Sequence, residues 1–377
     1  MKRWRIGFAA GILALGTAVS ATAQGIGGAA DTTASYFSPG PGALARLDLS
    51  PWLELRLRHD AVADRPGGPD FDRQRATLRA GLSWERPSRP LRIEAGLRAS
   101  LGSDHNRETW SSFDNETADT VEVDRLGVRV TSSGPASRGH PARLSFGKLR
   151  LPVPLTELLW DDDLRPVGIA VDSRLGGAGA EGFIVSGGAF QRSRLTSEDV
   201  RFYVAQIGGV GGNPATRGHE ERVSYLGVGH RDQLLTRGLV RQNAVPANAF
   251  QVFDVQLAGH AHVGRWRVTA RLDGALNTAT GSDRRAYRTR LAVGGAGAPA
   301  GVEAGWIHQR IERDALSGAF NSDDWWFHGR ARGNALFVQA GLGRAVSARI
   351  VGFRERRDDA STATRRIVTE LRWHVGD

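Results

Sequence analysis

The sequence predicts an all-β fold, a transmembrane antiparallel β-barrel of about 16 strands. Two observations lead to this fold class. Segments of about nine to eleven residues alternate between apolar and charged side chains, and tryptophans tend to lie near the ends of these segments. A strand directs successive side chains to opposite faces, so each segment has one apolar and one charged face. A barrel in lipid uses both faces, because its exterior is apolar and its interior is polar.

The clearest alternation lies at the C-terminal end of the chain. There Ile367, Leu371 and Trp373 share one predicted face, and Arg366 and Arg372 share the other. The same period recurs in residues 73–84, 91–99, 265–276 and 286–293. Each of these segments therefore predicts a strand with an apolar side and an ionic side.

Alternation also fits a soluble β-sandwich, whose apolar faces pack against each other. Three features favour a barrel in lipid: the length of the segments, their crowded ionic faces, and tryptophans placed as an interfacial girdle would be. Those tryptophans are Trp52, Trp84, Trp266, Trp306, Trp325 and Trp373. We therefore expect the barrel, with the soluble all-β fold as the alternative.

The connections between segments alternate in length, as in barrels with short periplasmic turns and long outer loops. Short connections are expected at 86–90, 262–264 and 296–300, and long ones at 60–71, 102–119, 149–179, 277–285 and 310–324. A strand with its connection takes about 22 residues, which gives an even number of strands from about 14 to 18, with 16 preferred. The stretch at 231–249 and two short links at 333–334 and 344–346 disturb the alternation of lengths.

The N-terminus has the pattern of an export signal. Lys2, Arg3 and Arg5 precede an apolar stretch from Ile6 to Val19, and an A-x-A cleavage pattern ends at Ala23. The apolar stretch rises only about 21 Å as a helix, too short for a bilayer core of about 30 Å. We expect residues 1–23 to be a signal peptide, 24–46 an irregular lead-in and 47–377 the barrel.

Composition narrows the classes of protein that remain. The chain has 377 residues, a formal net charge of +10 and no cysteine, which excludes disulfide scaffolds, cysteine-bound metal centres and thiol nucleophiles. Of its 50 basic residues only Lys2 and Lys148 are lysines, and the arginines are spread along the whole chain. A nucleic-acid-binding protein would gather them in a patch or tail, so we expect no nucleic-acid partner.

The most distinctive segment runs from Gly147 to Gly168. It lacks alternation, contains three prolines and has the acidic run Asp161, Asp162 and Asp163. One interpretation is an outer loop with an exposed acidic tip. The other, which we favour because the loop has many apolar residues, is a loop folded into the barrel. Its acids would then narrow the pore opposite Lys148, Arg150, Arg165 and arginines of the wall.

This segment resembles a family of porins of Gram-negative outer membranes. The pattern is carried by Gly147, Lys148, Pro152, Leu159, Trp160, Asp161, Asp163, Leu164, Pro166 and Gly168. The resemblance is sharp over about 25 residues and architectural elsewhere. It implies an outer-membrane diffusion pore, and porins of this size commonly form homotrimers. One departure is the C-terminus, which ends in Asp377 rather than in an aromatic residue.

The charged faces of the strands predict the chemistry of the lumen. Arginines expected to point inward are Arg79, Arg92, Arg98, Arg143, Arg267, Arg271, Arg288, Arg290, Arg330, Arg332 and Arg372. Rings of arginine favour anions, and interspersed acids reduce that preference. The alternative is that these arginines mostly pair with neighbouring carboxylates and only line a wet wall.

The sequence thus predicts a water-filled channel for passive diffusion of small hydrophilic, preferentially anionic solutes, surrounded by outer-membrane lipid. The alternatives are a structural or adhesive barrel with a plugged lumen, and a secreted β-sandwich enzyme or lectin. No nucleophile motif such as G-x-S-x-G and no zinc motif H-E-x-x-H occurs. We expect no enzymatic activity, no cofactor and no metal site.

Overall fold

The strands of the protein follow the alternation of its sequence. The structure is a computed structural model, and it describes residues 48–66, 69–85, 90–102, 120–132, 141–175, 181–191, 201–213, 216–229, 250–295, 301–318, 320–322 and 324–376. The predicted signal peptide (1–23) and lead-in (24–46) lie outside these residues, as does the stretch 231–249.

Sixteen strands form within the described residues. They are β1 (Leu49–Ala63), β2 (Phe71–Glu85), β3 (Leu91–Gly102), β4 (Thr120–Thr131), β5 (Ala142–Lys148), β6 (Val167–Leu175), β7 (Gly182–Gln191), β8 (Arg201–Asn213), β9 (Arg217–Val228), β10 (Phe250–Val263), β11 (Trp266–Asn277), β12 (Arg285–Gly295), β13 (Val302–Ile311), β14 (Ala331–Gly341), β15 (Val346–Arg357) and β16 (Thr364–Val375). In the same part of the chain, no helix is long and apolar enough to cross a membrane.

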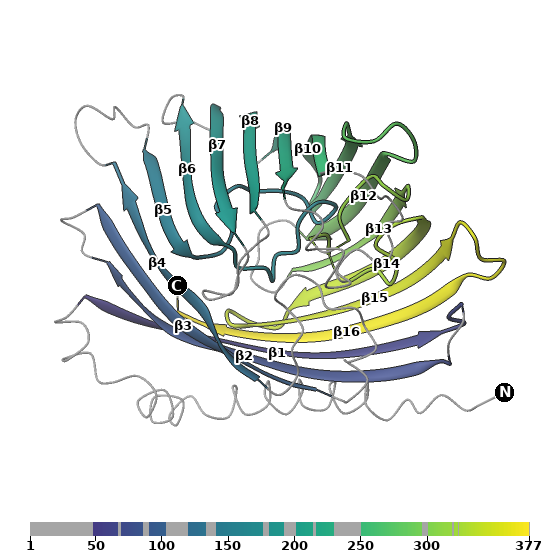
Figure 1. Ribbon diagram of the computed structural model, residues 1–377. Coiled ribbons are helices and arrows are strands. Elements are labelled where there is room, and N and C mark those ends of the chain that lie inside the picture. Colours follow the sequence, from purple (N-terminus) through teal and green to yellow (C-terminus); the bar gives the residue numbers. More distant parts are fainter. Residues whose placement is uncertain are drawn as a thin grey trace, which may run out of the picture.

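The sixteen strands form one closed antiparallel barrel (Figure 1). Each strand pairs with its neighbours in sequence, and β1 closes the ring against β16, from Leu53 opposite Val375 to Ala63 opposite Arg365. Closure leaves no sheet edge with unpaired backbone groups. The predicted fold class and the preferred strand number are both confirmed.

The connections divide the barrel into two ends. At the short-turn end, β1 starts, β16 stops, and short turns such as residues 342–345 join the strands. At the long-loop end lie the loops that follow the odd-numbered strands, including residues 149–166 between β5 and β6 and residues 312–330 between β13 and β14.

Two predicted connections are wrong. The long connection expected at 149–179 stops at residue 166, because Val167–Leu175 pairs with both β5 and β7. The short link expected at 333–334 lies inside β14, and the long loop before it extends to residue 330. Both corrections restore the regular alternation of short and long connections. Local composition was misleading there, because strand pairing is decided by neighbours far away in the sequence.

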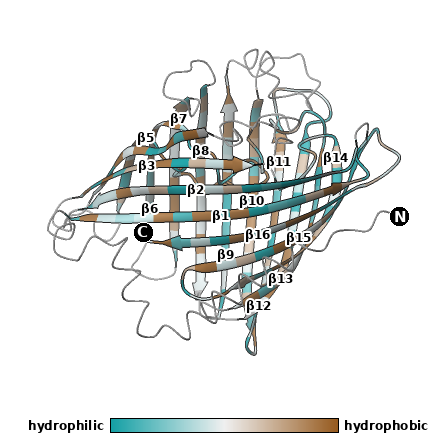
Figure 2. Cartoon of the chain, turned by 90° about the horizontal axis from the view of Figure 1, so that it is seen from below, coloured by the Kyte–Doolittle hydropathy of each residue, from teal (hydrophilic) through white to brown (hydrophobic). Residues whose placement is uncertain are grey.

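Hydrophobic and hydrophilic residues alternate along the strands (Figure 2), and the two faces of the wall differ accordingly. Large apolar side chains cover the exterior: Leu336 is 66% exposed, Phe146 64% and Leu97 54%. Trp266 and Trp373 lie among them at the short-turn end of their strands. Polar residues such as Asp124 and Arg79 lie buried on the inner face.

Two of the tryptophans assigned to an exterior girdle lie inside. Trp325 belongs to the β13–β14 loop and is buried, and Trp52 is buried on the inner face of β1. Glycines leave room for the Trp52 ring, because a Cβ on Gly81 or Gly96 would lie 2.5 or 2.4 Å from it. The guanidinium of Arg125 covers the ring at 4.2 Å from its centroid.

The hydrophobic core lies within the barrel, towards the long-loop end. The β5–β6 and β13–β14 loops turn inward and pack on an apolar part of the inner wall formed by β6 to β13. A second apolar cluster packs Trp325 of the β13–β14 loop against Phe337 of β14 and Phe353 of β15. The inner wall around β1 and β2, and most of that of β16, is ionic. This division of the lumen positions the candidate site.

Candidate functional site

The β5–β6 loop (residues 149–166) lies inside the ring of strands (Figure 1). Pro152, Pro154 and Pro166 lack an N–H group, so this segment cannot extend the sheet ladder. Backbone N–H groups of Leu159 and Trp160 donate to the carbonyl of Thr156, which closes a tight turn at the middle of the loop. The interpretation as a loop folded into the barrel agrees with this geometry.

Apolar packing anchors the loop. Leu158 and Leu164 are fully buried, and the Trp160 ring lies 5.1 Å from Phe202 of β8 and 5.6 Å from Phe320. Each fully buried side chain of this size contributes about 1.5–3 kcal/mol. The anchoring is therefore strong at the centre of the loop, independently of any charge.

The β13–β14 loop (residues 312–330) is bound to the β5–β6 loop. The N–H of Asp161 donates to the carbonyl of Phe320 at 2.6 Å, and the N–H of Ser322 donates to the carbonyl of Glu157 at 3.1 Å. The sequence predicts a long connection at 310–324 but not that it folds into the barrel. A signal was present in its run of buried aromatic residues, which include Phe320, Trp325 and Phe327.

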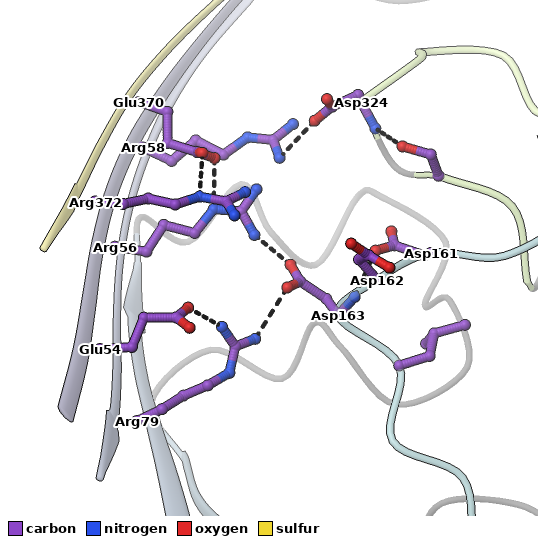
Figure 3. A network of polar contacts seen from close by, with 12 residues as sticks. Glu54, Arg56, Arg58, Arg79, Asp161, Asp162, Asp163, Asp324, Glu370 and Arg372 are labelled. Carbon is purple, nitrogen blue, oxygen red and sulfur yellow. Dashed lines mark hydrogen bonds and ion pairs between the residues drawn. The ribbon is translucent and has the colours of Figure 1, made fainter. Parts of the chain in front are cut away.

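The tip of the β5–β6 loop reaches the ionic wall at Asp163 (Figure 3). Its carboxylate accepts from Arg56 of β1 and, at 3.2 Å, from Arg79 of β2. Burial alone would raise the pKa of Asp163, but the guanidiniums of Arg56 and Arg79 hold that pKa well below its usual range. The carboxylate is therefore charged and docked at neutral pH.

Further acids hold the two arginines in place (Figure 3). Arg56 also donates to Glu370 of β16 at 2.5 Å, and Arg79 donates to Glu54 at 2.6 Å. Glu370 accepts a second bond from Arg372, also at 2.5 Å. These carboxylates hold the two guanidiniums in position for Asp163.

The β13–β14 loop makes a parallel contact with the wall. Asp324 pairs with Arg58 at 3.0 Å and with Arg349 at 2.8 Å. The backbone carbonyl of Asp324 accepts from Arg366 at 2.7 Å. Each inward loop thus presents one aspartate to the arginine wall formed by β15, β16, β1 and β2.

Beside the docked loops lies a cavity of about 560 Å³. Its wall includes the loop acids Asp161, Asp162 and Asp163 and, from β11 and β12, Arg267 and Arg271. Among the described residues, Arg267 and Arg271 have no ion-pair partner. Acids and arginines nearly balance around this cavity.

A second cavity of about 650 Å³ opens at the short-turn end. Six arginines and two glutamates line it, together with His374. It shares Gly341, Ser347 and Arg372 with the first cavity, so the two adjoin along the wall. A polar path thus runs from the loop tip to the short-turn end, and the part at that end is strongly positive.

Most arginines expected to face inward lie on the inner face. These are Arg79, Arg92, Arg98, Arg143, Arg267, Arg271, Arg288, Arg290 and Arg372. Several pair with carboxylates, as the alternative interpretation held: Arg98 with Glu122 at 2.8 Å, and Arg288 with Glu157 of the loop at 3.0 Å.

Two assignments are wrong. Arg332 faces outward, because its exposed face of β14 also carries Leu336 and Val338. Arg330 is not in a strand: it is the last residue of the β13–β14 loop, has a φ of 55°, and lies 3.7 Å from Asp359.

The basic residues of the segment from Gly147 to Gly168 have separate roles. Arg150 pairs with Asp162 at 2.6 Å in an exposed position, and Lys148 is buried at the end of β5. Arg165 donates to the carbonyls of Asp162 and Leu164, at 2.5 and 3.1 Å, and burial lowers the pKa of its guanidinium. Arg165 therefore shapes the loop tip from within.

The motif glycines mark close backbone approaches. Gly147 has a φ of +108°, and a Cβ there would lie 2.3 Å from the Leu126 carbonyl oxygen. A Cβ on Gly168 would lie 2.3 Å from the Ala189 carbonyl oxygen. Glycine is thus required at both ends of the loop, where the chain leaves and rejoins the wall.

The residues missed by sequence reasoning are Arg56, Arg58, Asp60, Asp124, Glu157, Asp324 and Arg349. Alternation in residues 53–60 was a usable signal for Arg56, Arg58 and Asp60. Within the described ranges, no group of three or more acids and histidines is arranged to hold a metal ion.

No protein-family model matches the chain, and no curated protein matches it. Among solved structures it is similar to OprB of Pseudomonas putida at low pH, with a TM-score of 0.55 and 9% identity, covering 93% of this chain and 98% of that one. It is also similar to a BenF-like porin from Pseudomonas fluorescens Pf-5, with a TM-score of 0.52 and 10% identity over 88% and 99% of the two chains. For OccAB1 of Acinetobacter baumannii the TM-score is 0.51 at 8% identity, over 87% and 97%. At these identities the likeness shows a shared fold, the closed antiparallel barrel of porin structures.

Proposed function

We propose that this protein is an outer-membrane porin of a Gram-negative bacterium, exported by a signal peptide cleaved after Ala23. The apolar exterior supports the membrane location. Large side chains such as Leu101, Phe146 and Leu336 are each more than 60% exposed on the outer face of the barrel. A continuous apolar surface of this kind is unfavourable in water and favourable in lipid. The short-turn end then faces the periplasm, and the long loops face outward.

The proposed activity is passive diffusion of small hydrophilic solutes past the tip of the β5–β6 loop. One observation carries it: an acidic loop tip is folded into the lumen and held on an arginine wall, beside a polar cavity that continues to the short-turn end. Charged groups on both sides of a narrow passage select solutes by size and by charge.

A preference for anions follows from the unequal charges along this path. The cavity at the short-turn end has six arginines against two glutamates, and Arg267 and Arg271 of the inner cavity have no ion pair among the described residues. The acids of the loop tip are largely engaged with arginines. The net field therefore raises the local concentration of anions.

A second candidate function is a structural barrel with a plugged lumen. The apolar packing of the β5–β6 and β13–β14 loops against β6 to β13 favours it, because that packing fills part of the interior. The two functions differ in one measurable property, since a plugged barrel carries no current.

Recording from the folded protein in a planar lipid bilayer under a tenfold KCl gradient tests the proposal. We expect stepwise conductance and a reversal potential of the sign set by chloride permeation. A reversal potential of the cation-selective sign would contradict the anion preference but not the proposal that the protein is a channel. Silence from inserted, folded protein would favour the plugged barrel.

A further inference from the structure

Four arginines lie on the outer face of the barrel at its long-loop end. They are Arg310 of β13, Arg332 of β14, and Arg354 and Arg356 of β15, which we call the outer-rim arginines. Each alternates with inward residues such as Gln309, Ala331 and Glu355, which are buried. Arg332, Arg354 and Arg356 are exposed, and Arg310 is partly exposed.

Strand register places these arginines side by side. Arg310 is directly opposite Arg332, and Arg332 is directly opposite Arg356. Arg354 is opposite Arg365 of β16, whose guanidinium pairs with Asp64 at 2.7 Å. Directly opposite residues have Cβ atoms about 4.5–5.5 Å apart, and like charges at that spacing destabilise a sheet.

No carboxylate neutralises the outer-rim arginines in the part of the chain that the structure describes. None of the four has an ion pair there. The nearby Asp359 pairs with Arg330 and Arg357 instead. A row of like charges without a counter-charge of its own calls for an external anion.

Their height on the barrel places the arginines at the border of the apolar band. On β15 the outward residues Val346, Ala348 and Ile350 are followed by Gly352 and then Arg354. Eight residues from Val346 to Arg354 span about 27 Å, or about 20 Å in height for a tilted strand. The apolar band of such barrels is about 25 Å tall, so these side chains extend into the headgroup layer.

Polar and aromatic groups lie beside the arginines and on their apolar side: Tyr287 is directly opposite Arg310, and His308 is directly opposite Asn334, one outward position nearer the apolar band. The Tyr287 hydroxyl contacts His308 at 3.4 Å, and Asn334 accepts hydrogen bonds from His308 at 3.0 Å and Trp306 at 3.2 Å. These groups form the layer between the arginines and the apolar side chains. This is the order in which a lipid presents phosphate, glycerol or sugar, and acyl chain.

We propose that the outer-rim arginines form a binding site for the phosphorylated headgroup of an outer-leaflet lipid. Guanidinium groups bind phosphate in a bidentate manner, and two or three neighbouring ones surround a phosphate group from several sides. The site rests on the proposed membrane location of the barrel, and it is independent of conduction through the lumen.

Native mass spectrometry of the full-length folded protein in detergent tests this site, with lipid A carrying two phosphates as the probe. In the variant Arg332→Gln/Arg354→Gln/Arg356→Gln we expect binding to weaken roughly tenfold or more. The matched control is Arg201→Gln/Arg217→Gln, which removes two exposed outward arginines from β8 and β9, away from the cluster. This control should bind lipid A as the wild type does.

Two further binding measurements identify which part of the lipid the arginines recognise. Dephosphorylated lipid A should bind the wild type as weakly as lipid A binds the triple variant, and millimolar inorganic phosphate should not displace lipid A. Equal binding of lipid A by the wild type and the triple variant would overturn the proposal, as would equal binding of the dephosphorylated form. Displacement by inorganic phosphate would overturn the lipid assignment.

Bilayer recordings keep this proposal separate from the proposed function. The triple variant should conduct as the wild type does, because the outer-rim arginines do not line the lumen. Specific binding of lipid A by a protein that carries no current would support the lipid site and contradict the channel. Conduction without phosphate-dependent binding would contradict the lipid site alone.

Discussion

Replacing Asp163 by asparagine tests how the loop tip is held on the barrel wall. The substitution removes one charge from a buried ion pair with Arg56 and Arg79 and preserves the size of the side chain. Removing one partner of a buried pair costs about 3–5 kcal/mol. Arg56 keeps Glu370 and Arg79 keeps Glu54, so we expect the lower end, about 3 kcal/mol, which is roughly a hundredfold in the docking equilibrium.

The assay is single-channel recording of Asp163→Asn beside Asp162→Asn. Both variants lose one negative charge at adjacent positions, but the Asp162 side chain is 71% exposed and, among the described residues, pairs only with the exposed Arg150. An exposed pair contributes about 0–1 kcal/mol, so the loop of Asp162→Asn should stay docked and its recordings should show no more transitions than the wild type. Asp163→Asn should show a larger conductance with more frequent transitions. Equal conductance and equal noise in the two variants would refute the docking argument.

Three further outcomes follow from the packing and the charges. Trp160→Ala should lower the stability of the folded barrel by about 3–5 kcal/mol through the cavity it leaves, measured by thermal unfolding in detergent; an unchanged midpoint would contradict the packing of the loop. Gly96→Ala should reduce the yield of folded protein, because the new Cβ would lie 2.4 Å from the Trp52 ring, whereas Gly274→Ala, with no heavy atom within 4 Å of its Cβ, should fold normally. The lowered pKa of Asp163 means that its ion pairs contribute stability above the unfolded value near 3.9 and lose it as pH falls through the lower folded pKa. Conductance should therefore be constant from about pH 8 to pH 5 and change below about pH 4, and a transition near pH 7 that disappears in Asp163→Asn would contradict this.

The strands, and the inward direction of most arginine side chains, could be predicted because alternation is a local property of the sequence. A period of two along one strand decides which side of the wall each residue faces, whatever its partners are. The inward direction predicted for the Arg332 side chain was wrong, because no alternation marks the start of β14 after a long loop. The assignment of Trp52 to an exterior girdle was wrong, because glycines of the neighbouring strands make room for its ring inside the barrel.

The partners of the loop tip could not be predicted from the sequence. Asp163 contacts Arg56 and Arg79, which are 107 and 84 residues away. Closure of the barrel brings these strands to the loop. No local sequence pattern indicates that residues so far apart in the chain will be in contact. The acidic run and the prolines of residues 149–166 did predict an irregular loop with a charged tip, but not the β13–β14 loop that packs beside it.

The most direct test of the central claim uses the absence of cysteine from the chain. Asp162→Cys places one reactive thiol on the wall of the inner cavity, and Ile350→Cys places one on the lipid-facing exterior, where Ile350 is 51% exposed. A bulky methanethiosulfonate reagent is added during bilayer recording of each variant. If solutes pass beside the loop tip, labelling Asp162→Cys reduces the current and labelling Ile350→Cys leaves it unchanged. An unchanged current from fully labelled Asp162→Cys would contradict the account.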